Sequence, residues 1–192
     1  MKQLLSDVIQ RLSEASMPED YSRPRGNNRL FEYVDLNWGQ ADFYAGFPPP
    51  IKFPAALVDV VGDDASTMGA NAQIDIVQLE VRIIDMVLGN SSAQAPPEQR
   101  ERAFAIFDLV RQTKALLHGW TAEGISQSPA GSPPAAGYGP LTHTGTKRIS
   151  RRDGLREFQL LFRVQLSGYD AVNIPATAPV GIQMVKLNVG HK

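Results

Sequence analysis

The sequence contains no cysteine among its 192 residues. That absence excludes disulfide bridges, thiolate metal sites, iron–sulfur clusters and a thiol nucleophile, and it is compatible with a reducing compartment. The chain also lacks an excess of charge of either sign, because 19 basic residues face 20 acidic ones and the formal net charge is -1. No overall electrostatic field therefore draws the protein toward nucleic acid or an anionic membrane.

Long hydrophobic runs are missing too. No stretch approaches the roughly 20 apolar residues that a membrane-spanning helix needs, and Asp7 and Glu14 interrupt the N-terminal apolar pattern, unlike the core of a signal peptide. Apolar residues make up 43% of the chain, which is typical of a folded globular protein. We expect one α+β domain over residues 1–192, with extended loops at about 30–54 and 124–140 and a C-terminal extension over 171–192.

Motifs for catalysis and phosphate binding are absent from the sequence. It has no GxxxxGK[ST] loop, no complete dinucleotide fingerprint and no nucleophile elbow. The three histidines are scattered, with no pair at a metal-ligand spacing. Asp59, Asp63 and Asp64 could hold a divalent cation, but an acidic turn at a strand end is the commoner meaning of this pattern. We therefore expect no enzymatic activity, no metal and no cofactor.

Two segments have the periodicity of amphipathic helices. Residues 2–15 carry one apolar stripe, which must be covered by the same domain or by a neighbouring subunit. Residues 98–118 begin with acidic residues, which the helix dipole favours at that end. The apolar stripe of the first helix is Leu4, Leu5, Val8, Ile9 and Leu12, and the predicted buried stripe of the second is Ala103, Ile106, Phe107, Val110 and Leu117.

Several segments read as strands. Residues 55–61 form a short apolar strand that we expect to end in a turn at residues 62–64. Residues 74–88 alternate in polarity, with a slip near Val77 that suggests a β-bulge. Residues 182–189 look like a final strand, which could pair with the sheet edge of a neighbouring chain.

A β-hairpin is the strongest local prediction. Residues 141–152 and 155–167 flank Asp153-Gly154, a dipeptide suited to a two-residue type I′ turn. That turn would set Ile149 opposite Phe158, and Arg151 opposite Arg156. The second strand alternates in polarity, which predicts one buried and one polar face: the buried face would carry Phe158, Leu160, Phe162, Val164 and Leu166, and the polar face Glu157, Gln159, Arg163 and Gln165. We expect a mostly antiparallel sheet in which this long hairpin packs against the N-terminal helix and the central helix.

Two surfaces are candidates for contact with a partner. The aromatic segment that includes Phe43, Tyr44 and Phe47 either wraps the core or forms a contact patch. A basic hairpin tip could be merely solvated, could contact an acidic partner, or could contact nucleic-acid phosphates. The residues of this predicted tip are Lys147, Arg148, Arg151, Arg152 and Arg156.

The order of elements resembles that of the tail terminator, or tail-completion, proteins of tailed bacteriophages. The similarity rests on residues 74–88, on the helix over 98–118, and on residues 151–155 running into 158–170. It is a similarity of architecture and covers about two thirds of the chain. The family brings no catalytic residues that could be carried over to this sequence.

The resemblance implies a structural virion protein of the phage neck, assembled in the host cytoplasm. Such a protein forms a homo-oligomeric ring, usually a hexamer, that ends the tail tube and joins it to the head–tail connector or stopper protein, with DNA passing through its channel and no membrane involved. Alternatives are another neck or tail component, such as a head-closure stopper or a tube-like protein, a small-molecule-binding domain with the aromatic segment as a pocket wall, and a nucleic-acid-binding module.

Overall fold

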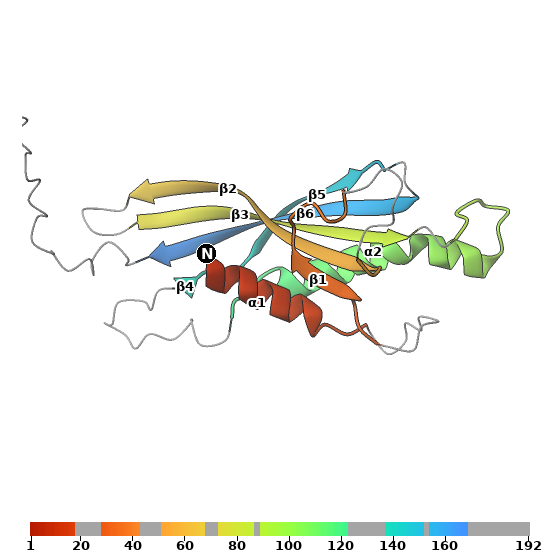
Figure 1. Cartoon of the computed structure of the whole chain (residues 1–192), viewed down its shortest axis with the longest axis horizontal. Coiled ribbons are helices and arrows are strands. Elements are labelled where there is room, and N and C mark those ends of the chain that lie inside the picture. The colour runs from red at the N-terminus through yellow and green to blue at the C-terminus, as the bar shows by residue number, and fades with distance from the viewer. Residues whose placement is uncertain are drawn as a thin grey trace, which may run out of the picture.

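The computed structural model describes residues 1–17, 28–42, 51–67, 73–86, 89–122, 137–151 and 154–168. Within these ranges a curled six-stranded sheet is covered on one face by two helices, as Figure 1 shows, which confirms the predicted α+β class. The elements in chain order are α1 (Lys2–Ser13), β1 (Tyr33–Leu36), β2 (Ala55–Thr67), β3 (Gln73–Met86), α2 (Pro97–Leu117), β4 (Gly137–Tyr138), β5 (Thr142–Ile149) and β6 (Leu155–Gly168).

The sheet is mostly antiparallel, as expected. Strands run in the order β1-β2-β3-β6-β4, and β5 also pairs with β6. Only the pairing of β1 with β2 is parallel among these strands. The alternation of apolar and polar residues on the long central strands explains this arrangement, because it gives the sheet one apolar face for the helices and one mixed outer face.

Strand β2 is longer than the sequence suggested. It continues from Ala55 through to Thr67, so the turn predicted at residues 62–64 is wrong. The predicted bulge falls at the right level of the sheet but on the opposite strand, since the register shift lies between Val60 and Gly62 on β2 while β3 stays regular opposite it. One extra residue on β2 lets the strand continue through the acidic segment without losing its pairing.

The main core lies between the helices and the inner face of the sheet. From α1 it takes Leu4, Val8 and Leu12, each fully buried, so the apolar stripe of the N-terminal helix is covered by its own domain. The predicted alternation on β6 is confirmed, since its inward residues are buried. These sheet residues are Ala56, Val58, Val77, Leu79, Val81, Ile83, Phe158, Leu160, Phe162 and Val164.

The hairpin of β5 and β6 forms with a register one residue away from the predicted one. Ile149 lies opposite Glu157, and Arg148 lies opposite Phe158. β5 ends at Ile149 and β6 begins at Leu155, and Gly154 adopts the expected positive φ of 77°. A one-residue slip moves side chains to the other face of a sheet, so the predicted pairing of Arg151 with Arg156 is wrong.

Parts of the predicted loops are ordered elements. The stretch predicted as a loop at 30–54 contributes β1 and buried residues such as Phe31, and the end of the loop predicted at 124–140 is strand β4. The predicted C-terminal extension at 171–192, with its final strand at 182–189, lies outside the described residues. The single domain over 1–192 stays a prediction.

Candidate functional site

Four of the five basic residues predicted to form a hairpin tip are described, and they lie in different surroundings. Lys147 and Arg148 are exposed on β5, where successive side chains point to opposite faces of the sheet. Arg151 is largely buried in ion pairs, and Arg156 donates a hydrogen bond to the backbone carbonyl of Ala103 on α2. Arg152 lies outside the described residues, as do the predicted contact residues Phe43, Tyr44 and Phe47.

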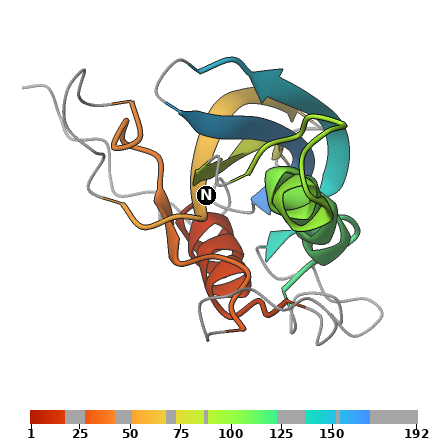
Figure 2. The same cartoon turned by 90° about the vertical axis from the view of Figure 1, so that its right-hand side faces the viewer.

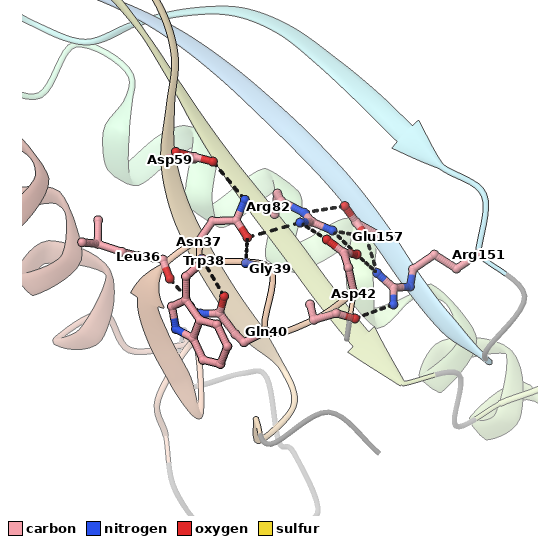
Figure 3. A network of polar contacts seen from close by, with 11 residues as sticks. Leu36, Asn37, Trp38, Gly39, Gln40, Asp42, Asp59, Arg82, Arg151 and Glu157 are labelled. Atoms are coloured by element: carbon pink, nitrogen blue, oxygen red, sulfur yellow. Dashed lines mark hydrogen bonds and ion pairs between the residues drawn. The ribbon is translucent and has the colours of Figure 1, made fainter. Parts of the chain in front are cut away.

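Arg82 is the centre of a charged network on the outer face of the sheet, drawn in Figure 3. Its Nε donates to Glu157 Oε1 at 2.7 Å and its Nη2 to Glu157 Oε2 at 3.1 Å. The same guanidinium donates to Asp42 from Nη1 at 2.7 Å and from Nη2 at 2.8 Å. Arg82 thus holds two carboxylates in fork geometry at once, which is the arrangement that guanidinium favours.

Arg151 completes the network from the hairpin connection. Its Nη1 lies 2.8 Å from Glu157 Oε2 and 3.1 Å from Asp42 Oδ1, and its Nη2 donates to the carbonyl of Ala41 at 2.7 Å. Two arginines therefore face two carboxylates, and the formal charges cancel. The network fastens the segment of residues 37–42 to the sheet.

Polar bonds around residues 37–42 hold that segment in its position. Asn37 accepts from Arg82 Nη1 at 3.3 Å and donates from Nδ2 to Asp59 at 3.0 Å. The fully buried Gln40 donates to the carbonyl of Leu36 at 2.7 Å and accepts from the backbone N–H of Trp38 at 2.9 Å. A small second core lies beside the network and includes Ala41, Ile51, Ala55, Leu57 and Ile84.

The electrostatics of the network indicate a structural role. Hydrogen bonds to Asp42 raise the pKa of Arg82 further above its usual value, and the hydrogen bond from Arg82 lowers the pKa of Asp42. The lowered pKa of Asp42 keeps that carboxylate ionised near neutral pH, so it is not poised to act as a proton donor. The arrangement can lock a segment in place, but it offers no free acid, base or nucleophile.

Sequence reasoning missed this network for a physical reason. A buried Glu157, with its side chain 1% exposed, was predicted to lie on the polar face of β6. A weak indication of the contact between Arg82 and Glu157 lies in the strand pairing. Glu157 is the direct partner of Ile84, and Arg82 lies two residues from Ile84 on the same face of the sheet. Nothing in the sequence indicated that Asp42 and Arg151 would join them.

A different surface is formed by α2 and β5, on the helix-covered side of the molecule. A groove of about 770 Å³ lies there, and its lining combines apolar side chains, two cationic side chains and two histidines. Phe107, which was predicted to be buried, is 50% exposed, and Phe104 beside it is 48% exposed. The groove is lined by Phe107, Val110, Arg111, Lys114, Ala115, His118 and His143.

The helical stripe was misjudged because α2 carries apolar residues on more than one face. Leu109 is fully buried in the core, whereas the prediction had placed Phe107 there. The ring of Phe107 makes a T-shaped contact with that of Phe158 at a centroid distance of 5.4 Å. Phe104 lies 6.1 Å from Phe107. The two rings form an aromatic ridge that the described parts of the chain leave about half exposed.

The two histidines in the groove do not form a metal or catalytic centre. His118 Nδ1 accepts the backbone N–H of His143 at 3.1 Å, and His143 Nε2 lies 3.0 Å from Thr146 Oγ1. Desolvation lowers the pKa of His143, with a smaller effect from Lys114. In the part of the chain that the structure describes, no group of three metal-ligating side chains comes together, and no described helix is long and apolar enough to cross a membrane.

Comparisons with known proteins give little guidance. No family model matches the sequence, and no curated protein matches it. Among solved structures, a chain in a structure titled "Virion of native gene transfer agent (GTA) particle" is similar to this chain over 86% of its length and 95% of the other chain, with 13% sequence identity and a TM-score of 0.44. A similarity of that size identifies neither a family nor a function.

Proposed function

We propose that the chain is a structural subunit of a phage neck, where it forms a ring that terminates the tail tube and joins it to the head–tail connector. The observation that carries the proposal is the exposed aromatic ridge of Phe104 and Phe107 beside the groove that Arg111 and Lys114 line on α2. Exposed apolar surface of this kind is characteristic of sites that bind another protein.

The internal chemistry of the chain supports an assembly role over catalysis. The charged cluster around Arg82 fixes residues 37–42 to the sheet, and its two arginines pair with two carboxylates. The long strands β2, β3 and β6 form a rigid curved sheet, which suits a subunit that must keep its shape within a larger wall. Contacts between subunits then add to the stability of each subunit within the assembly.

The position in the neck rests on the resemblance of the element order to tail terminator proteins. On that basis the partners are identical copies in a hexameric ring, the tail tube protein on one side and the connector or stopper protein on the other. DNA would pass through the central channel without sequence-specific contacts, and the protein would be located in the virion after assembly in the host cytoplasm.

The mass of the purified chain in solution tests this function. Light scattering at low and high protein concentration should give a closed oligomer near six subunits, and electron microscopy should show rings with a central hole. Rings that bind one end of isolated tail tubes support the terminator role. Rings that bind only the connector would point to a head-closure stopper, and incorporation along the tube to a tube-like protein.

A monomer at every concentration, and in the presence of tail tubes, would overturn the proposal. The small-molecule-binding alternative would then gain weight, because the groove beside His143 is the described site that could take a ligand. Soaking the monomer with a fragment mixture and recording chemical shifts of groove residues would separate these two outcomes.

A further inference from the structure

Two exposed surfaces of opposite charge lie on opposite sides of the sheet. The first, the aromatic–basic face, consists of Phe104, Phe107, Arg111 and Lys114 on α2. Its two phenylalanines are about half exposed, and Arg111 and Lys114 line the groove beside Phe107. Arg111 pairs with Asp108 at 3.1 Å, which offsets one charge and leaves the face positive.

The second surface, the acidic edge, consists of Asp35, Leu36, Asp59, Val61 and Asp63 on β1 and β2. Leu36 is 43% exposed and Val61 is 48% exposed, while Asp63 is exposed and the other two carboxylates are partly exposed. Asp35 accepts the Tyr33 hydroxyl at 2.8 Å. Carboxylates and exposed apolar side chains thus follow one another along the β1–β2 edge of the sheet, and their chemistry is complementary to that of the aromatic–basic face.

The topology separates the two surfaces. β3 and β6 lie between β2 and β5 in the sheet, and Figure 2 shows α2 and β5 on one side of the molecule with β1 on the other. One subunit therefore cannot bring its own aromatic–basic face to its own acidic edge. A second copy can, because it presents the missing surface while leaving one of its own free.

We infer that the aromatic–basic face of one subunit docks on the acidic edge of the next copy of the chain. This inference rests on the proposed ring and assigns the surfaces that build it. Because the two surfaces differ, the contact is head-to-tail: each added subunit leaves one free surface of each kind, and growth ends only when a ring closes. A two-fold dimer that uses both pairs would need the two surfaces on one side of the subunit, whereas this fold places them on different sides.

The energetics favour the aromatic residues as the anchors of this contact. Exposed aromatic side chains that become buried at the centre of an interface commonly weaken binding by about tenfold or more when they are truncated. The surrounding charges mainly set orientation and choice of partner. Assembly should therefore weaken as the salt concentration rises. Truncating one of the two phenylalanines should weaken it more than salt does.

Mixing two disabled variants gives a decisive experiment. Phe104→Ser with Lys114→Glu disables the aromatic–basic face, and Leu36→Ser with Asp63→Lys disables the acidic edge. Each variant alone should lose the ring and sediment as a monomer in analytical ultracentrifugation. A mixture of the two should form a 1:1 heterodimer that grows no further, because it contains one intact pair of surfaces.

Controls separate this inference from the proposed function and from misfolding. Circular dichroism and thermal unfolding must match the wild type, and Met86→Ser, which alters a side chain 45% exposed but outside both surfaces, should still form rings. A wild-type monomer would defeat the proposed function. Wild-type rings that persist in either disabled variant, or a mixture that forms no complex where the wild type assembles, would overturn only the assignment of surfaces.

A nucleic-acid role for the aromatic–basic face is a further outcome of the same experiment. If Phe104→Ser with Lys114→Glu keeps its rings but loses a salt-sensitive affinity for duplex DNA, the face binds phosphates in place of a neighbouring subunit. That result would overturn the inference.

Discussion

Replacing Arg82 with methionine should destabilise the fold by about 3–5 kcal/mol, because it breaks a buried ion pair and leaves the two carboxylates of Glu157 and Asp42 to share one arginine, Arg151. Glu157 would remain in place with its side chain 1% exposed, and Arg82 itself is only 9% exposed. For a chain of this length, that loss corresponds to a melting temperature lower by roughly 6–20 °C.

The structure indicates which of the two carboxylates matters. Arg82 donates two hydrogen bonds to Glu157 and two to Asp42, but Asp42 is 51% exposed. Water screens the exposed pair, so Asp42→Asn should cost only about 1 kcal/mol or less. Most of the loss in Arg82→Met should therefore come from the buried Glu157, which loses two hydrogen bonds and keeps its contact with Arg151.

A double-mutant cycle tests this reasoning by chemical denaturation at one protein concentration. Arg82→Met combined with Glu157→Leu removes both charges, so its cost should be well below the sum of the two single changes. The reasoning is refuted if Arg82→Met costs under about 1 kcal/mol, or if the two changes add without coupling.

Three further predictions concern other parts of the chain. Burial raises the pKa of Glu80, so the ionised carboxylate destabilises the fold above that pKa. Glu80→Gln should therefore stabilise the protein at neutral pH. In urea titrations this gain should shrink as the pH falls and disappear below the pKa that Glu80 has in the unfolded state. Tyr138→Phe removes the 2.8 Å hydrogen bond to Asp7 that joins β4 to α1 and should lower stability by about 1–2 kcal/mol without breaking rings, as thermal unfolding and light scattering would reveal. Gly89→Ala would push a Cβ against the Gln99 carbonyl and to 2.7 Å from the Ala103 backbone nitrogen, so we expect a loss above about 2 kcal/mol in the same unfolding assay, and wild-type stability would contradict the close packing.

Local periodicity was a reliable guide wherever burial repeats along one element. The inward face of β6, the stripe of α1 and the span of α2 follow from the alternation of apolar and polar residues, because each residue position then has a fixed face. Phe107 marks the limit of that approach. Its spacing fits the buried stripe, but α2 carries more apolar residues than the sheet can cover, and only the packing decides which of them stay exposed.

Register and long-range contacts were beyond the reach of the sequence. The Asp153-Gly154 dipeptide favoured a two-residue turn, but pairing across the whole hairpin settled a register one residue away. Residues with no shared pattern, such as Asp42 and Arg151, meet only because the chain returns over the outer face of the sheet. Their contact depends on the three-dimensional path of the backbone and has no local signature.

By itself the sequence determined the α+β class, the inward faces of the long elements, the absence of thiol chemistry and the balance of charge, since these depend on composition and on spacing within one segment. The tertiary structure alone decided that the predicted basic tip is divided, with Arg151 committed to a buried ion pair while Arg148 stays on the surface. It also decided which aromatic side chains stay exposed for a partner. Both outcomes depend on contacts between distant segments, which form only when the sheet and its helices pack together.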